Sequence, residues 1–351
     1  MDTLTHALSG ALIARAVMPA RLPHTTRADC MALGFLAAAF PDADVVLSYL
    51  SPLAYLYYHR GVTHSLLLLP LWAMALAWLW SRLRRRPHAF RSYLLVAGLG
   101  LGMHILGDLI TSFGTMILAP LSDMRIAWDS TFIIDLWLSG IVVMGLIASA
   151  IVRGSRLPAM LGLATLCGYV GFQAWQRERA IDVGEQYARA HAIDTATVSA
   201  LPRPVSPYNW MVIVATADDY RYSFVNLRRA QPRALGPDDG FVARLDAPYL
   251  PVAMAQWQSA TKLGAGSDRT LAEQVWRDPG FRFFRWFAAY PVLAEVQHGN
   301  PSRCVWFQDL RFLTPGRPSW PFRYGMCSSE EAPHWQAYQA LEPGKSLALS
   351  R

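Results

Sequence analysis

Four long apolar segments constrain most strongly what this chain can fold into. They cover residues 62–81, 92–118, 130–152 and 157–176, and each is close to the length of about 20 residues that a helix needs to cross a bilayer. Two further segments are marginal, because residues 30–50 carry two aspartates and residues 3–18 are short. With 53% hydrophobic and only 16% charged residues, the chain suits a membrane protein with an attached soluble part. We therefore expect an all-α polytopic membrane domain of about six helices over residues 1–176.

Arginines between the apolar segments predict the orientation of the helices. Basic residues near the ends of spans stay on the cytoplasmic side. The loops that carry them are 19–29, with Arg21 and Arg27, 82–91, with RLRRRPHAFR, and 153–156, with Arg153 and Arg156. The opposite loops, 51–61 and 119–129, hold only Arg60 and Arg125, so we expect residues from 177 onward to lie outside. Because the arginines are spread over separate loops, the pI near 9.4 does not indicate a nucleic-acid partner.

The remaining residues, 177–351, have the pattern of a soluble α+β domain with an antiparallel sheet. A polar helical stretch, RERAIDVGEQYARAHA, comes first, and the segments NWMVIVATA and YRYSFVNL then alternate around a turn and predict a β-hairpin. Further strands are expected at 291–297, 303–312 and 321–327, with a helix near 269–277. Cys304 and Cys327 lie on two of these strands, so an oxidising compartment would allow a disulfide between them.

Seven histidines and aspartates lie within the apolar segments. They are His6, Asp42, Asp44, His64, His104, Asp108 and Asp135. Ionisable side chains in a span are costly and normally face a cavity or a partner. Counted from the basic loops at about 1.5 Å per residue, the two aspartates of FPDAD lie roughly 18–21 Å up their helix, and the histidine and aspartate of HILGD roughly 18–24 Å up theirs. Helices that run in opposite directions thus bring His and Asp to one layer.

Two short motifs favour a shared site. In HILGD, His104 and Asp108 are four residues apart and project from one helical face. In FPDAD, Pro41 interrupts the backbone hydrogen bonds, which lets Asp42 and Asp44 turn toward one cavity.

The motif HRGVTHS lies at the start of an apolar segment. Its Gly61 permits a tight bend, and Thr63 is expected to cap the helix that follows. His59 and Arg60 would then lie at the mouth of the site. Arg60 and Arg125 are the candidates for binding a phosphate or carboxylate of a substrate.

Several of these residues also have a simpler explanation. His104 alone could bond to a neighbouring helix, and Asp135 is as consistent with an interhelical hydrogen bond as with catalysis. His59 could be an ordinary loop residue, and Arg60 could anchor the chain at the membrane interface. The convergence of the whole set on one layer is what favours a site.

Imidazole and carboxylate groups without a thiolate suit a divalent metal ion. Zinc is favoured, with manganese or magnesium as alternatives, and the sequence has no CxxC or Cys/His zinc pattern. The expected metal ligands are His6, Asp42, Asp44, His64, His104 and Asp108, and the expected catalytic residues are Asp42, Asp44 and His59. Because these ligands exceed one tetrahedral site, either two ions bind or the surplus carboxylates act as base and orient the ligands. An open coordination position would hold a water whose pKa the ion lowers.

Four motifs in order resemble one known family. MDTLTHALSGALIA, FPDAD, HRGVTHSLL and GMHILGDLITSFGTMILAPLSD are similar to the membrane-bound metal-dependent hydrolases, also labelled LexA-binding, inner membrane-associated or YdjM-like hydrolases, over about residues 1–180. The resemblance implies a metal-dependent hydrolase of the bacterial inner membrane and carries over to His6, Asp42 with Asp44, His59 with His64, His104 with Asp108, and the loop residues Gly114 and Pro120. The helical His/Asp arrangement is also distantly similar to zinc-dependent phospholipase C and P1-type nucleases, which favours phosphoesters. A LexA-type partner is implied only by the family's label.

The leading hypothesis is hydrolysis of an ester or phosphoester in a lipid or other membrane-associated substrate. A transporter or a metal or proton conduit would also place His and Asp in spans. A conduit should continue them to the cytoplasmic face, however, where LLLLPLWAMALAWLW and SYLLVAGLGLG are apolar. A non-enzymatic membrane receptor with a purely structural metal is the other rival. An intramembrane metalloprotease is disfavoured, because the sequence has no HExxH motif.

Overall fold

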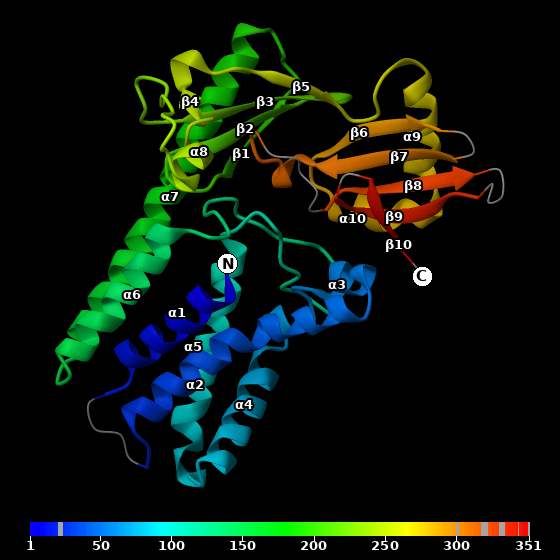
Figure 1. The fold of residues 1–351 in the computed structure, drawn as a ribbon. Helices are drawn as coiled ribbons and strands as arrows, with labels where there is room; N and C mark the ends of the chain where they lie inside the picture. The colour runs from blue at the N-terminus through cyan, green and yellow to red at the C-terminus, as the bar shows by residue number, and fades with distance from the viewer. Residues whose placement is uncertain (20–23, 300–301, 317–321, 330–333, 343, 350–351) are drawn as a thin grey trace. The chain divides into compact units, whose positions relative to one another are not determined.

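Apolar helices pack side by side in the N-terminal part of the chain (Figure 1). The computed structural model describes residues 1–19, 24–299, 302–316, 322–329, 334–342 and 344–349. The chain divides into two units, of which the first comprises residues 1–47, 58–177 and 202–207 and the second residues 48–57, 178–201 and 208–351. We describe each unit separately.

The first unit is helical. Its helices are α1 (Thr3–Val17), α2 (Arg27–Ala39), α4 (Leu69–Leu83), α5 (Phe90–Leu109), α6 (Leu136–Ile151) and the first part of α7 (Leu157–Ala190). Among the described residues, three helical stretches are long and apolar enough to cross a membrane: Arg27–Tyr49, Pro87–Leu109 and Leu157–Ala190. A bent pair, Pro52–His64 with Leu69–Leu83, makes a fourth if it counts as one span, and Leu136–Ile151 is a shorter apolar helix.

Three of the predicted spans have the wrong limits. The segment predicted as 130–152 becomes helical only at Leu136. The segment predicted as 62–81 becomes α-helical only at Leu69, after a short 3₁₀ helix at Val62–His64, and the segment predicted as 92–118 leaves the helix at Leu109. The intervening loops pair with each other instead, because Leu66 N–H donates to the Ile117 carbonyl and Met116 N–H donates to the Arg60 carbonyl, each at 2.9 Å. The backbone groups that leave the two helices therefore remain satisfied within the protein, as an apolar environment requires.

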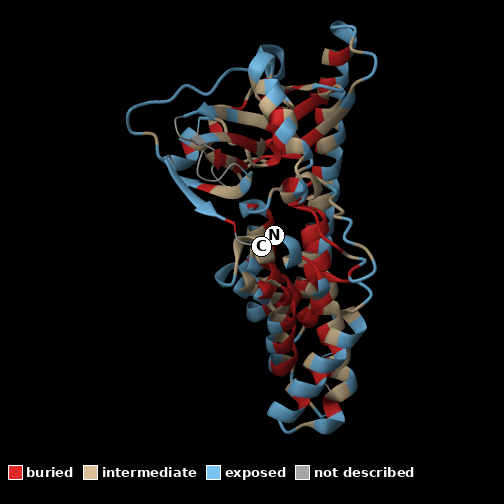
Figure 2. Cartoon of the chain, turned by 90° about the vertical axis from the view of Figure 1, so that its right-hand side faces the viewer, coloured by how far each residue is buried: buried red, intermediate tan, exposed pale blue. Residues whose placement is uncertain are grey.

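Small residues set the distance between α1, α2 and α5. A Cβ atom on Gly10 of α1 would lie 2.2 Å from the carbonyl oxygen of Gly34 on α2, and one on Gly100 of α5 would lie 3.0 Å from the same oxygen. Glycine at these positions lets three backbones approach closely, which is how small residues drive helix association in membranes. Buried residues concentrate toward the inside of the helical unit (Figure 2).

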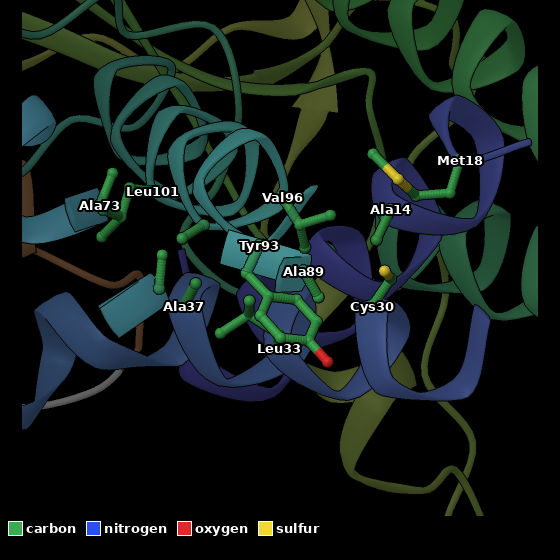
Figure 3. Close-up of a cluster of buried hydrophobic side chains, with 12 residues drawn as sticks. Ala14, Met18, Cys30, Leu33, Ala37, Ala73, Ala89, Tyr93, Val96 and Leu101 are labelled. Atoms are coloured by element: carbon green, nitrogen blue, oxygen red, sulfur yellow. The ribbon is translucent and has the colours of Figure 1, made fainter. Parts of the chain in front are cut away.

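An apolar core fills the end of the helical unit that lies toward the arginine-rich loops. Its buried members include Cys30, Leu33 and Ala37 on α2 and Tyr93, Val96 and Leu101 on α5 (Figure 3). Cys30 is completely buried in this core and packs there as a small apolar residue.

The three arginine-rich loops meet at one end of this unit. Arg27 donates to the carbonyl of Arg153 at 2.7 Å, and Arg156 donates to the carbonyl of Val17 at 2.9 Å. Arg86 pairs with Asp29 at 2.8 Å. The expected grouping of loops 19–29, 82–91 and 153–156 on one face is therefore what the described residues show, whereas Arg21 lies outside the described residues.

The second unit is built on two sheets. The first contains β1 (Thr197–Pro202), β2 (Asn209–Ala215), β3 (Asp219–Asn226), β4 (Leu250–Pro251) and β5 (Gln258–Thr261). The second runs in the order β10 (Lys345–Ala348), β9 (Gln336–Glu342), β8 (Tyr324–Ser329), β7 (Ser302–Asp309) and β6 (Pro291–His298) and is antiparallel throughout. The helices of this unit are α3 (Pro52–Tyr58, all but its last residue), α8 (Phe241–Asp246), α9 (Gly266–Arg277), α10 (Arg282–Phe287) and the last part of α7.

The structure confirms an antiparallel sheet domain after the helices. The predicted hairpin is present, since β2 and β3 pair antiparallel from Asn209 with Asn226 to Ala215 with Tyr220. The strands expected at 291–297 and 303–312 correspond to β6 and β7, although β7 ends at Asp309. The strand expected at 321–327 starts at Tyr324, and residue 321 lies outside the described residues. The polar helical stretch after residue 176 is not a separate helix, because α7 continues through it.

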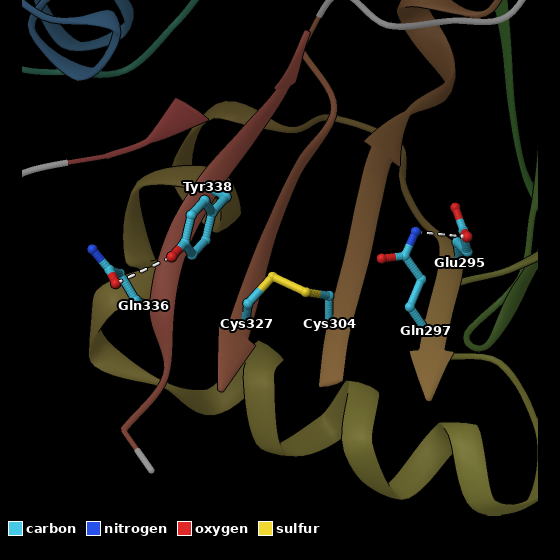
Figure 4. Close-up of a disulfide and its surroundings, with 6 residues drawn as sticks. All are labelled: Glu295, Gln297, Cys304, Cys327, Gln336 and Tyr338. Carbon is cyan, nitrogen blue, oxygen red and sulfur yellow. Dashed lines mark hydrogen bonds between the residues drawn. A yellow bond between two sulfur atoms is a disulfide. The ribbon is translucent and has the colours of Figure 1, made fainter. Parts of the chain in front are cut away.

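A disulfide joins the two cysteines of the second sheet. Cys304 on β7 and Cys327 on β8 face each other directly in the strand register and are bonded (Figure 4). Cross-strand partners lie close enough for such a bond. The disulfide that the sequence allows is therefore present.

Thiol counting tests the disulfide. Under denaturing, non-reducing conditions we expect alkylation of two of the four cysteines, Cys30 and Cys167, and alkylation of all four after reduction. Mass spectrometry of the alkylated chain gives the count directly. The variant Cys304→Ser should show three reactive thiols without reductant, and four alkylated cysteines in the unreduced wild type would contradict the bond.

The glycine crossing generates a second prediction. Gly10→Ala should destabilise the protein by about 1–3 kcal/mol, the usual cost of overpacking a tight interface. The matched control is Gly102→Ala on α5, where the nearest atom to a new Cβ lies 4.0 Å away. Thermal unfolding of the purified protein in detergent compares the two variants. Equal midpoints for Gly10→Ala and Gly102→Ala would show that the crossing does not limit stability.

Candidate metal centre

Helix α5 supplies two of the residues that meet in the helical unit. His104 and Asp108 lie one turn apart on α5, and both side chains are completely buried. The ring nitrogen Nδ1 of His104 lies 2.6 Å from the carbonyl oxygen of Ala38. A carbonyl accepts but does not donate, so this nitrogen carries the proton and Nε2 presents its lone pair to the cavity.

The FPDAD motif brings the carboxylates to the same place. Pro41 has no N–H to continue the α-helical ladder, and the chain changes from α2 to a 3₁₀ helix over Phe40–Tyr49. One oxygen of Asp42, Oδ2, accepts a hydrogen bond from the Thr3 hydroxyl at 2.6 Å, while Oδ1 faces His64 and His104. The proline therefore ends the α-helix just before the two aspartates.

The HRGVTHS motif forms a sharp reversal. Arg60 has a positive φ of 59°, and Gly61 N–H donates to the Tyr58 carbonyl at 2.9 Å. A Cβ on Gly61 would lie 2.7 Å from that carbonyl oxygen, so the bend requires glycine at this position, as expected. The expectation that Thr63 caps the next helix is wrong. Its hydroxyl donates to Asp44, and Ser65 Oγ accepts from Leu67 and Leu68 N–H instead.

Four ligand atoms from these motifs form one group that could hold a metal ion. They are Asp42 Oδ1, His64 Nε2, His104 Nε2 and Asp108 Oδ2. His64 Nε2 lies 3.2 Å from Asp108 Oδ2 and 3.7 Å from Asp42 Oδ1. His104 Nε2 lies 3.4 Å from Asp108 Oδ2 and 3.6 Å from Asp42 Oδ1. Four ligands at about 2.0 Å from a central ion lie about 3.3 Å apart in a tetrahedron. The group therefore has the donor types and the spacing of a site for zinc or a similar ion.

Unpaired buried atoms support the fit to a metal. His64 Nε2, His104 Nε2 and Asp108 Oδ2 are buried and make no hydrogen bond with the described residues. The other oxygen of Asp108 receives three donors: the Arg60 guanidinium at 2.8 Å, His6 Nε2 at 3.1 Å and the Met1 amino group at 2.5 Å. Buried polar atoms without partners are rare in proteins and call for a ligand. A cation at the centre of the group would pair all three.

Asp44 has a different environment from Asp42. Its Oδ1 lies 2.7 Å from His59 Nδ1, and its Oδ2 accepts from Arg60 N–H at 3.0 Å and from the Thr63 hydroxyl at 3.1 Å. Through these contacts the Asp44 carboxylate fixes the backbone of HRGVTHS and the ring of His59. The structure thus separates the two aspartates, which were both expected as ligands, since Asp44 is not among the four atoms of the group.

His6 lies beside the group rather than within it. Its ring stacks on His104 with centroids 3.8 Å apart, and its Nε2 contacts the oxygen of Asp108 that points away from the group. His6 thus packs against two of the proposed ligands and would hold their orientation.

The two arginines expected at the mouth make internal contacts. Arg60 is 2% exposed and bonds to Asp108 and to the Thr111 hydroxyl, so it lies inside the site rather than at an open rim. The left-handed backbone at Arg60 turns its side chain inward. Arg125 is half-buried and donates to the carbonyls of Gly114 and His59 at 3.1 Å and 3.2 Å, which ties its loop to HRGVTHS.

Asp135 belongs to a separate structural contact. It caps α6 by accepting from the N–H groups of Trp137 and Leu138, and it also accepts from Tyr169 and Gln173 on α7. This is the interhelical hydrogen bonding that was one of the two expected explanations.

Sequence reasoning missed the groups that position the site residues. The Thr3 and Thr63 hydroxyls donate to Asp42 and Asp44. The Thr111 hydroxyl accepts from Arg60, and the Ala38 carbonyl accepts from His104. Only Thr3 carried a usable signal, since it precedes His6 by three residues on one helical face.

Metal analysis of purified variants tests the four-atom group. We expect the wild type and the control His88→Ala, which alters an exposed loop histidine, to retain bound metal. His64→Ala and His104→Ala should lose it, because each removes one of four ligands. Inductively coupled plasma mass spectrometry gives the stoichiometry. Stoichiometric metal in both site variants would contradict the proposed ligands.

Comparisons with known proteins agree with this description of the helical unit. A model of the YdjM inner membrane protein family matches residues 1–180, which is just over half of the 351 residues. No curated protein and no solved structure matches the chain. The matched region contains every residue of the candidate metal centre, from His6 to Asp108. The chain belongs to the YdjM inner membrane protein family.

Proposed function

We propose that this protein is a membrane-embedded, metal-dependent hydrolase that cleaves an ester or phosphoester of a lipid or other membrane-associated substrate. The observation that carries the proposal is the four-atom group of Asp42, His64, His104 and Asp108, three of whose buried atoms make no hydrogen bond with the described residues. Zinc suits this donor set best, with manganese or magnesium as alternatives. When bound, such an ion would supply a nucleophile at neutral pH by lowering the pKa of a coordinated water.

The Asp44–His59 pair would act as the base beside the group. The 2.7 Å contact from His59 Nδ1 to Asp44 favours the tautomer with the proton on Nδ1, so that Nε2 is the basic nitrogen. The rings of His59 and His64 have centroids 6.0 Å apart, which brings His59 within reach of a small molecule held at the group. The Asp44 carboxylate also stabilises the positive charge that His59 gains when it accepts a proton.

Arg60 would stabilise negative charge on the substrate. Its guanidinium is fully buried, contacts Asp108 at 2.8 Å and lies over the Phe113 ring at 5.0 Å. A fixed cation in an apolar environment interacts strongly with an anion that develops during the reaction. Arg125, which is tied to the His59 carbonyl, would bind a phosphate or carboxylate only after breaking that contact. Arg60 is therefore our stronger candidate.

The apolar core beneath the group argues against a conduit. On the side of His104 and Ala38 that lies toward the arginine-rich loops, the buried neighbours are apolar residues such as Leu101, Ala97, Ala37 and Leu33. An ion or proton that crossed toward the arginine-rich loops would have to pass this core without polar partners. The arrangement therefore supports a site that is open on one side.

We further propose that six helices cross or enter a bacterial inner membrane, with the arginine-rich loops in the cytoplasm. The meeting of these loops at one end of the helical unit supports this orientation, because basic residues are retained on the cytoplasmic side. The Cys304–Cys327 disulfide supports an extracytoplasmic second unit, because such bonds persist in oxidising compartments.

Turnover measurements test the hydrolase proposal. Metal-loaded wild-type protein should cleave at least one member of a panel that contains phosphatidylglycerol, phosphatidic acid and p-nitrophenyl phosphate in mixed micelles. His59→Ala should retain the metal but lower kcat by about 10²–10⁴-fold, the usual contribution of a general base. Phosphate release and lipid mass spectrometry provide the readouts.

The outcomes separate the three classes of function. Metal-loaded wild type without turnover on the whole panel would contradict the hydrolase and favour a receptor with a structural metal. Metal-dependent ion flux in vesicles would favour the conduit. Turnover that is unchanged in His59→Ala would leave the hydrolase standing but remove the Asp44–His59 pair from its mechanism.

A further inference from the structure

An apolar pocket lies next to the candidate metal centre in the helical unit. It has a volume of about 260 Å³ and is walled by Leu106 of α5 and Ile110 just after it, Leu138 of α6, and Leu166 and Val170 of α7. The same cavity reaches Gly107, the residue that immediately precedes the ligand Asp108. The pocket and the metal group therefore share one turn of α5.

A single glycine, Gly107, lies between this pocket and His6. A Cβ on Gly107 would lie 2.9 Å from Cε1 and 3.1 Å from Nδ1 of His6, so the imidazole edge packs directly on the bare backbone. His6 is completely buried, and its Nδ1 makes no hydrogen bond with the described residues. An unpaired polar atom thus lies against Gly107, one of the residues that line this mainly apolar pocket.

The outer side of the pocket is apolar and partly open. Leu106 and Trp128 are each 51% exposed at its edge, and Cys167 on α7 is an exposed free thiol. These residues belong to the helices or loops of the helical unit, whose outer surface would contact lipid in a membrane. A molecule that enters here comes from the bilayer, not from water.

We infer that this pocket holds one hydrocarbon chain of a membrane lipid, with the polar end of that lipid at the metal centre. The inference rests on the proposed function and names its substrate class. An amphipathic lipid matches the pocket in both respects, since its chain needs apolar walls and its ester or phosphoester would lie near Gly107, next to His6 and Asp108. At about 30 Å³ per methylene, which is about the volume of a water molecule, the pocket holds roughly nine carbons.

A second copy of the chain or a peptide fits the pocket less well. A peptide would bring backbone N–H and C=O groups into a lining whose only hydroxyl, that of Ser9, already donates to the His6 carbonyl at 2.7 Å. Unsatisfied peptide groups are costly in such a site. A hydrocarbon chain carries no such groups.

Photo-crosslinking in vesicles tests the inference. The wild-type protein is reconstituted in phosphatidylglycerol vesicles that contain a phospholipid with a diazirine in one acyl chain, and crosslinked peptides are mapped by mass spectrometry. We expect adducts on α5 near Leu106 and on α7 near Leu166 to Val170. Leu106→Trp should reduce these adducts about tenfold, the effect of losing the burial of about two methylene groups.

Leu95→Trp is the matched control. Leu95 lies on the same helix, is 49% exposed against 51% for Leu106, and does not line the pocket. Adducts should therefore be unchanged in Leu95→Trp, and both variants should keep their metal. Adducts that are spread evenly over the outward faces of the helices, or that are equal in the two variants, would overturn the inference.

The same experiment separates this inference from the proposed function. Crosslinking should persist in His59→Ala, because filling the pocket requires no chemistry. An unlabelled pocket in a protein that hydrolyses p-nitrophenyl phosphate would overturn the lipid site and leave the hydrolase. A labelled pocket in a protein that cleaves no member of the panel would support the lipid site and overturn the hydrolase.

Discussion

The close crossing of α1, α2 and α5 at three glycines is the contact on which the rest of the helical unit depends. Gly10, Gly34 and Gly100 let these backbones touch, with the oxygen of Gly34 at the centre. One helical turn from each glycine, about 6 Å along the axis, lie His6, the Ala38 carbonyl and His104. The crossing thus places the stacked histidines and the carbonyl that fixes the tautomer of His104. A wider crossing would separate the rings of His6 and His104 and lengthen the contact between His104 and the Ala38 carbonyl.

The unpaired polar atoms of the four-atom group destabilise the metal-free protein, and a bound metal would remove this destabilisation. Each buried polar atom without a partner costs about 1–3 kcal/mol, and three such atoms lie in the four-atom group. Together they approach the whole stability of a typical domain, about 5–15 kcal/mol. Binding of a structural zinc contributes about 10–16 kcal/mol in small model sites, so the same atoms that burden the metal-free protein would stabilise the loaded one. This difference is why unpaired atoms are better support for a metal than the residue types alone.

The sequence predicted that three motifs meet, but it also grouped Asp135 with them, and it did not predict the role of each residue. Helical spacing and depth indicate that FPDAD, HRGVTHS and HILGD reach one layer, and the structure brings their side chains together. The separation of Asp42 from Asp44 could not be predicted, because it depends on the Arg60 N–H and the Thr63 hydroxyl, which a non-local turn brings to Asp44.

The sequence did not predict where the helices end, because their ends also depend on contacts with distant parts of the chain. The loop after Leu109 is as apolar as a helix, and its conformation depends on hydrogen bonds with HRGVTHS, about 50 residues earlier in the chain. In the second unit the hairpin was predictable from two segments rich in apolar and aromatic residues, whose strand positions are mostly buried, whereas β9 and β10 have mostly exposed or half-buried positions. Once the turn at Arg60 is known, however, the roles follow: the reversal that carries the Arg60 guanidinium inward also presents its N–H to Asp44. One backbone conformation therefore orients both carboxylate partners of the site, Asp108 through the side chain and Asp44 through the main chain.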